Sequence, residues 1–153
     1  MSVVTQLAEN DVFRAYTTYA AIVLLKMIVM SPITAYYRMT RKAFANPEDA
    51  AMRGGDIKKY LRTDQDVERV RRCHLNDLEN IVPFIGLGLV YALSNPDLHV
   101  ALLHFRIFAG SRVLHTISYL VPLPQPSRAL TFSAGLLVNV SMAYATLRSV
   151  CYL

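Results

Sequence analysis

The fold is decided first by residues 13–37, which read FRAYTTYAAIVLLKMIVMSPITAYY. As a helix that rises 1.5 Å per residue, this stretch is about 37 Å long, enough to cross a hydrocarbon core about 30 Å thick. Pro32 is expected to kink the helix near its end. The stretch therefore predicts a first membrane-spanning helix.

The composition of the whole chain agrees with this reading. Apolar residues make up 54% of the 153 residues and charged residues only 18%, and the mean hydropathy is +0.30. The length allows one domain. Because the apolar residues are gathered into membrane-length blocks, an all-α integral membrane bundle is favoured over the alternative, a soluble four-helix bundle. The segment before Phe13 lacks the basic residues of a secretory signal, so we expect the first block to be retained.

Three further spans follow, at about 64–93, 98–120 and 128–147. A loose capping box at 63–66 begins the second, which is long enough to project out of the membrane. The turn Ser94-Asn95-Pro96-Asp97 offers an N-cap for the third. The proline-rich segment 122–126 ends it, and Ser127 is expected to cap the fourth.

The distribution of basic residues predicts the orientation of these spans. Ten Lys or Arg residues lie between Arg38 and Leu75, whereas the opposite side has only Arg14 and Arg148. By the positive-inside rule the loop 38–63 is cytosolic, and both termini face the lumen or the exterior. Cys73 and Cys151 then lie on opposite sides of the membrane and cannot pair within one chain.

Three basic residues, Lys26, Arg106 and Arg112, fall inside the predicted spans. A charge at the centre of a span costs about 2.5–3.5 kcal/mol, so these side chains must face protein or trapped water. For Lys26 we expect a structural ion pair with Asp77 or Glu79. On the third span Arg112 shares a helical face with His115 and Tyr119, and Arg106 projects about 120° away. Two polar faces need two buried surfaces, which predicts a homo-oligomer.

The second span carries a polar stripe of Arg69, Arg72, Asn76 and Glu79, within an arc of about 80°. Arg69 alone reads as solvated, whereas we expect Glu79 to be buried. Arginines bind carboxylates, and a glutamate can receive an ammonium group, as a ligand such as glutathione requires. Arg128 at the start of the fourth helix would add a cation and the positive helix end to stabilise a thiolate.

Other chemistries lack their sequence signals. The four histidines are scattered and neither cysteine has a metal-ligand spacing, so no metal site is expected. Neither a glycine-rich phosphate loop nor a Gly-x-Ser-x-Gly elbow occurs. A channel or transporter is disfavoured because the polar residues gather toward one membrane face.

Four segments carry a resemblance to a known family. They are RKAFANPED (41–49), ERVRRCHLNDLEN (68–80), HTISY (115–119) and PQPSRAL (124–130). With these segments the chain resembles, over nearly its whole length, the membrane-associated proteins in eicosanoid and glutathione metabolism, the MAPEG family. The second segment is specific enough to indicate the family by itself.

The resemblance implies a homotrimer of four-helix subunits in the endoplasmic reticulum and outer mitochondrial membranes, with glutathione bound between subunits near the cytosolic face. It implies that Arg128 stabilises the thiolate, with Tyr119 as an alternative proton donor to the sulfur. The residues that it assigns to glutathione binding are Arg38, Arg71, Arg72, His74, Asn76, Glu79, His115 and Tyr119.

The sequence departs from the family at two places. The mammalian members that it resembles carry a cysteine after Asn-Pro-Glu-Asp, where thiol reagents activate them, whereas Ala50 and Ala51 follow Asp49 here. Cys73 is then the cytosolic thiol that is left, and we interpret it as packed or solvated. In the prostaglandin E synthase branch a serine follows the catalytic arginine, whereas here it is Ala129.

These observations predict a glutathione transferase that conjugates lipophilic electrophiles from the bilayer and reduces lipid hydroperoxides with glutathione, without a metal. Two alternatives stay open. One is an eicosanoid synthase of the same family, making leukotriene C or prostaglandin E, although Ala129 disfavours prostaglandin isomerisation. The other is a non-catalytic lipid-binding scaffold, which the presence of Arg128 disfavours.

Overall fold

The chain folds into helices of very unequal length in the computed structural model, which describes residues 3–150. The helices are α1 (Val3–Glu9), α2 (Asp11–Arg41), α3 (Pro47–Ala51), α4 (Ile57–Tyr60), α5 (Gln65–Leu93), α6 (Leu98–Leu120) and α7 (Ser127–Val150). Within residues 3–150 no strand is formed. The all-α class is therefore confirmed, while Cys151 lies outside the described residues.

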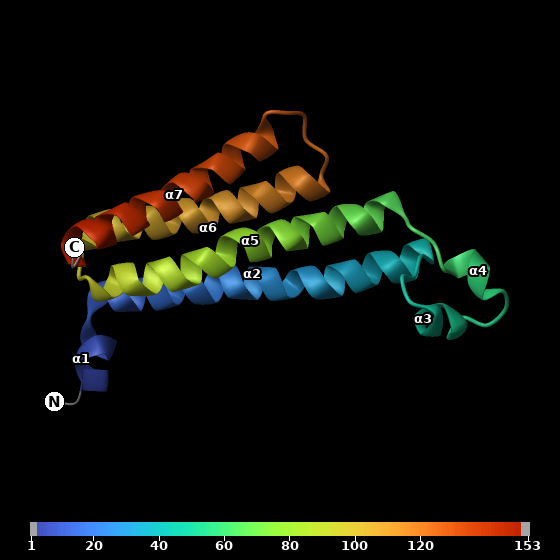
Figure 1. The fold of residues 1–153 in the computed structure, drawn as a ribbon, viewed down its shortest axis with the longest axis horizontal. Helices are drawn as coiled ribbons and strands as arrows, with labels where there is room; N and C mark the ends of the chain where they lie inside the picture. Colours follow the sequence, from blue (N-terminus) through green and yellow to red (C-terminus); the bar gives the residue numbers. More distant parts are fainter. Residues whose placement is uncertain (1–2, 151–153) are drawn as a thin grey trace.

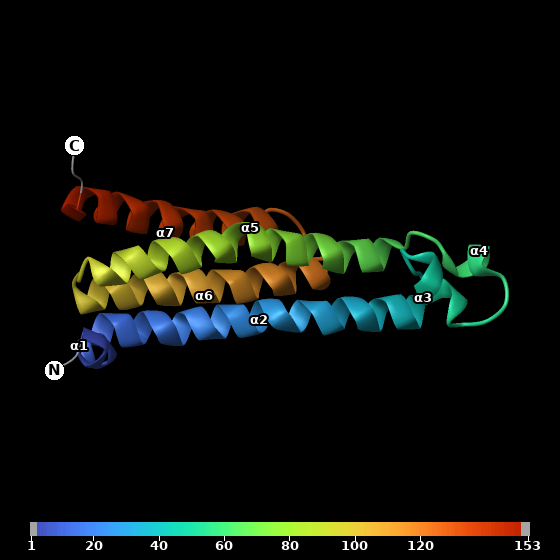
Figure 2. The same cartoon turned by 60° about the horizontal axis from the view of Figure 1, so that its bottom comes forward.

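Four long helices, α2, α5, α6 and α7, run alongside one another (Figures 1 and 2). The α2–α5 link, which contains α3 and α4, and the α6–α7 link lie toward the same end of the molecule (Figure 1). The α5–α6 turn, α1 and the last turn of α7 lie at the opposite end (Figure 1). The two loops that the sequence places on the cytosolic side thus share one end, which we call the basic end.

The predicted helix starts are confirmed at two places and wrong at one. The Asp64 side chain accepts hydrogen bonds from the backbone of Asp66 at 3.0 Å and Val67 at 3.3 Å, and so caps α5. The Asp97 side chain caps α6 by accepting from the Val100 backbone at 3.0 Å. Ser127, however, is the first residue of α7, and its hydroxyl donates to the Pro124 carbonyl at 2.8 Å instead of accepting a helix N–H.

Helix α2 is longer than the sequence indicates. Pro32 lies inside it, and the helix continues past the predicted end at residue 37 as far as Arg41. It ends at Lys42, which adopts the left-handed conformation with φ 50°. The predicted loop 38–63 is therefore partly helical, since the end of α2 and the short helices α3 and α4 all fall within it. Sequence reasoning missed these two helices and α1.

The core is aromatic where the long helices meet. Phe84 of α5 stacks on Phe108 of α6, with ring centroids 4.0 Å apart. Tyr16 of α2 donates to the Ile85 carbonyl of α5 at 2.7 Å. A Cβ on Gly88 would lie 2.8 Å from the Tyr16 ring, so the close approach of α2 and α5 requires glycine there.

The outer surfaces of the helices are strongly apolar. Helices α2 and α7 are long and apolar enough to cross a membrane by length and composition. The exposed side chains include Leu25, Ile28, Val82, Leu103, Leu137 and Leu147. Such contiguous apolar faces are typical of a protein that contacts lipid or a neighbouring subunit.

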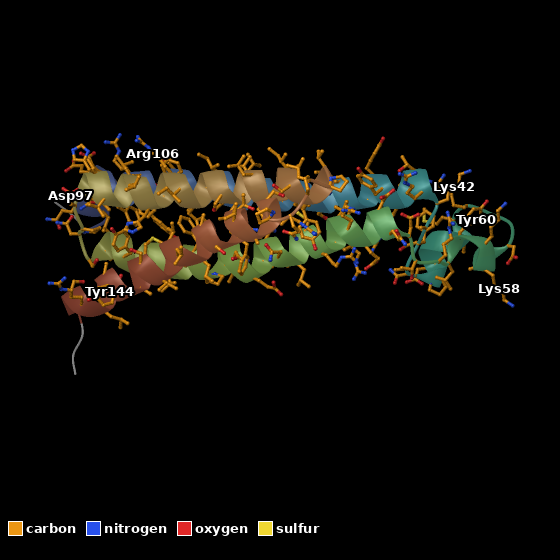
Figure 3. All side chains as sticks on the ribbon, turned by 90° about the horizontal axis from the view of Figure 1, so that it is seen from above. Lys42, Lys58, Tyr60, Asp97, Arg106 and Tyr144 are labelled. Carbon is orange, nitrogen blue, oxygen red and sulfur yellow. The ribbon has the colours of Figure 1, made fainter. Side chains whose placement is uncertain are left out.

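Inside this bundle lies a buried charge cluster of Lys26, Asp77 and Arg112. Asp77 forms an ion pair with Lys26, as the sequence predicted. The second Asp77 carboxylate oxygen lies 3.2 Å from Arg112 Nη2, and both of these side chains have no solvent exposure. Arg106, by contrast, is exposed on the outer surface and donates to the Tyr19 hydroxyl at 3.2 Å (Figure 3). One buried carboxylate is therefore shared by two cations, and the cluster keeps one unit of positive charge.

We expect Asp77→Asn to destabilise the protein by about 3–5 kcal/mol, because it leaves two cations without a counter-charge in an apolar interior. Lys26→Met should cost less than half as much, because the Asp77–Arg112 pair is retained. The measurement is the free energy of unfolding in mixed detergent micelles. An equal loss for the two variants would contradict the role given to Asp77.

Candidate functional site

The first part of the site is a cleft of about 670 Å³ toward the basic end, between α2, α5 and the α3 segment. This volume is in the range of pockets that hold small molecules. Three of the predicted glutathione-binding residues, Arg38, Arg71 and His74, line it. Its apolar wall is formed by Met39, Phe44, Met52, Leu75 and Leu78. The cleft thus combines a basic lining with an apolar one.

The helices bring the three polar residues together for simple geometric reasons. Arg38 lies in the last turn of α2, and Arg71 and His74 are three residues apart on α5, so they share a face of that helix. Arg71 donates to Glu68 at 2.7 Å. Arg38 Nε is buried and has no hydrogen-bond partner among residues 3–150. It is a donor that an anionic ligand could satisfy.

The loop supplies two cleft residues that the sequence reasoning did not name, Asp49 and Arg53. Arg53 Nη2 lies 3.4 Å from the Met39 sulfur, and its guanidinium carbon is 5.8 Å from the Phe44 ring centroid. Three arginines and one carboxylate then line the cleft. Only the basic character of the loop could have indicated Arg53 from the sequence.

The second part of the site lies where α6 ends and α7 begins. The guanidinium carbon of Arg128 stands 5.2 Å from the ring centroid of Tyr119, and the His115 and Tyr119 rings are 5.7 Å apart. His115 Nδ1 is 3.1 Å from the Thr131 hydroxyl oxygen. The structure therefore brings the two residues with catalytic assignments, Arg128 and Tyr119, into contact.

Within this second part, the Thr131 contacts indicate which ring nitrogen of His115 carries a proton. The Thr131 hydroxyl lies 3.0 Å from the Ser127 carbonyl, to which it donates. His115 Nδ1 must then donate to Thr131, because the single hydroxyl proton is already used. The other ring nitrogen, Nε2, is buried and has no partner within the described part of the chain.

Asn76 joins the second part of the site through the buried charge cluster. Its amide oxygen accepts from Arg112 Nη2 at 2.7 Å. Arg112, His115 and Tyr119 lie on one face of α6, as their spacing predicted, and Arg112 and His115 are buried there.

The remaining predicted residues, Arg72 and Glu79, lie on a third face of α5 and are exposed. We expected a buried Glu79, but this residue is exposed. Neither residue has a hydrogen bond or ion pair with another residue in the range 3–150. The predicted site residues therefore occupy three separate places, two basic clusters and an exposed stripe on α5.

The comparison with protein families agrees with this arrangement of helices and basic residues. The MAPEG family profile matches residues 16–148, almost the whole described chain. The protein belongs to the MAPEG family.

Individual relatives are similar over the full length. The chain is 61% identical to "Microsomal glutathione S-transferase 1" of Sus scrofa over 155 residues, which covers 100% of both chains. It is 60% identical to the protein of the same name from Homo sapiens, with 97% of each chain covered. Identity to "Prostaglandin E synthase" of Canis lupus familiaris is 41%, over 92% of this chain and 90% of the relative.

Proposed function

We propose that the protein is a membrane-bound glutathione transferase that conjugates glutathione to lipophilic electrophiles. The proposal is supported by the full-length identity of about 60% to proteins named microsomal glutathione S-transferase 1. The structural observation that carries it is the contact of Arg128 with Tyr119 in the first turn of α7. A permanent cation at the positive end of a helix is well suited to stabilise a thiolate.

The proposed assembly is a homotrimer in which all four long helices cross the membrane and glutathione binds between subunits near the cytosolic face. The positions of the site residues support this. Arg72 and Glu79 are exposed on the outside of α5, and Lys26 and Arg112 carry one unit of charge more than Asp77 neutralises. A neighbouring subunit that covers this stripe would bring its basic cleft opposite the Arg128 cluster of the first subunit.

In this arrangement the arginines, with His74 and Asn76, bind the carboxylates and carbonyls of the peptide, and Glu79 receives its ammonium group. Arg128 stabilises the thiolate, and Tyr119 is the alternative hydrogen-bond donor to the sulfur. No metal takes part in the proposed mechanism.

The thiolate then attacks an electrophilic carbon of the substrate, a carbon–sulfur bond forms, and the leaving group departs with its electron pair. We further propose that the same thiolate reduces lipid hydroperoxides. The sulfur attacks the terminal oxygen, the O–O bond breaks, and the lipid alkoxide leaves and takes a proton to become the alcohol. The thiol of a second glutathione then attacks the resulting sulfenic acid, which gives the disulfide and water. The location that the family resemblance implies, in the endoplasmic reticulum and outer mitochondrial membranes, remains a prediction.

Two alternatives are less well supported. Relatives named prostaglandin E synthase share 41–44% identity with the chain, well below the transferases, and Ala129 follows Arg128 here. Leukotriene C synthesis is an alternative that rests on the family resemblance alone. A lipid-binding scaffold would need neither Arg128 nor its contact with Tyr119.

The first test is the ultraviolet thiolate absorbance of glutathione bound to the detergent-solubilised protein, between about pH 6 and about pH 9. We expect the thiolate to form about two pH units below the free thiol, whose pKa is about 8.5, which corresponds to about 2.7 kcal/mol of stabilisation. In Arg128→Ala this shift should be lost, together with conjugation activity.

Arg148→Ala is the matched control, because Arg148 is an exposed arginine at the other end of the same helix. It should retain the thiolate band. Glutathione binding to the parent protein without a thiolate band would contradict thiolate activation and favour the scaffold.

A second test addresses the site between subunits. Arg38→Ala and Arg72→Ala should each weaken glutathione binding at least about tenfold, although the two residues occupy different places in one subunit. Arg62→Ala, on the exposed loop, should leave the affinity unchanged. Isothermal titration calorimetry measures the three affinities. If Arg38→Ala weakens binding and Arg72→Ala does not, the site lies within the cleft of one subunit.

A further inference from the structure

Arg112 has no role in the mechanism above, yet it is a fully buried arginine in contact with a predicted glutathione-binding residue. A single nitrogen, Nη2, donates to the Asn76 amide oxygen at 2.7 Å and to the Asp77 carboxylate at 3.2 Å. The Asp77 carboxylate in turn pairs with Lys26. The same Arg112 nitrogen is therefore bound to the Asp77 carboxylate and holds the Asn76 amide oxygen.

We propose that Arg112 is a positioning residue that fixes Asn76 as a hydrogen-bond donor toward the glutathione peptide; this inference rests on the proposed transferase function. An asparagine side chain can turn either its oxygen or its NH₂ group to a ligand. Here the oxygen is bound by Arg112, so the NH₂ group is the part that remains for a ligand. No residue in the described part of the chain accepts a hydrogen bond from this NH₂ group.

The surroundings of Asn76 are consistent with such a role. Asn76 is half-buried, and it lies on α5 between the buried Asp77 and the exposed stripe of Arg72 and Glu79. A carboxylate or carbonyl oxygen that reaches this stripe would meet the arginine and the NH₂ group together. The amide orientation therefore selects an acceptor group of the ligand and rejects a donor.

The charge cluster makes the proposal testable without loss of the fold. Removal of Arg112 leaves Lys26 and Asp77 as a neutral pair, whereas removal of Asp77 would leave two buried cations. Arg112→Met should therefore remain folded. Replacement of Asn76 by aspartate adds a second carboxylate beside two cations, which the cluster can also accommodate.

The experiment is a double-variant cycle on glutathione affinity, measured by calorimetry on the full-length detergent-solubilised protein. Arg112→Met and Asn76→Ala should each raise the Kd about tenfold. The double variant should bind no more weakly than either single variant, because Arg112 acts only through Asn76. Multiplied effects, about a hundredfold in the double variant, or an unchanged Kd in Arg112→Met would overturn the proposal.

Two further variants separate positioning from a purely structural role. Asn76→Asp should keep the thermal midpoint of the parent and yet lose more than tenfold in affinity, because it turns a negative oxygen to the ligand. Arg112→Lys should recover most of the affinity, since both bonds come from one nitrogen. Full affinity in Asn76→Asp would overturn the donor assignment.

Arg106→Met is the matched control, because Arg106 lies on the same helix but contacts Tyr19 on the outer surface. Its affinity should equal that of the parent. If the parent itself does not bind glutathione, the proposed function fails, and this inference fails with it. If the parent binds and the Arg112 and Asn76 effects are independent, only the positioning role is wrong.

Discussion

The rest of the structure depends on the neutralisation of charge inside an apolar bundle. Lys26 and Arg112 reach the same carboxylate from two helices, α2 and α6, and Asp77 of α5 stands between them. A charge in hydrocarbon is tolerated only when it is paired, so this cluster restricts how the three helices can be rotated about their axes. That rotation also determines which face of α5 meets the core and which faces carry Arg71 and Arg72 outward.

The same rotation separates the predicted site residues of α5 from one another. The core face of α5 is occupied by Cys73, Asp77, Asn80 and Phe84, all buried. The neighbouring residues on the helix must then point elsewhere, Arg71 and His74 into the cleft beside α2 and Arg72 and Glu79 to the open surface. A polar stripe with no partner, between two basic clusters and beside apolar outer faces, favours a neighbouring subunit as its cover.

The sequence was informative where one residue determines a local structure. The capping box at 63–66 predicted where α5 begins, the turn at 94–97 predicted the cap of α6, and a lysine inside a span predicted a pair with Asp77 or Glu79. It was less informative where the outcome depends on tertiary contacts. Helix α2 extends beyond residue 37 to Arg41, which pairs with Asp66 of α5 at 2.5 Å, and α3 and α4 form inside the predicted loop 38–63. Local propensity is a weak guide in such cases.

For the site, spacing on one helix was enough to place Arg112, His115 and Tyr119 on a common face. Spacing also placed Arg71 and Arg72, which are adjacent in the chain, on different faces of one helix. It could not show that Arg71 lines a cleft beside α2 while Arg72 is exposed. Successive side chains on a helix point about 100° apart. This angle assigns each residue to a surface only when the core-facing side of the helix is known, and that side depends on how the other helices pack. The contribution of Arg53 likewise depends on how the loop folds back onto α2.

The mixed lining of the cleft has a consequence for how two dissimilar molecules are supplied. The wall of the cleft includes Met39, Leu75 and Leu78, each of which is exposed, and the cleft lies toward the basic end, where its arginines are found. If the proposed function holds, a water-soluble peptide would arrive by three-dimensional diffusion at that end, and an oily compound dissolved in the bilayer would arrive by lateral diffusion at the flank. The concentration that governs the second encounter is therefore the number of molecules per unit of lipid, so the amount of membrane present becomes part of the rate law.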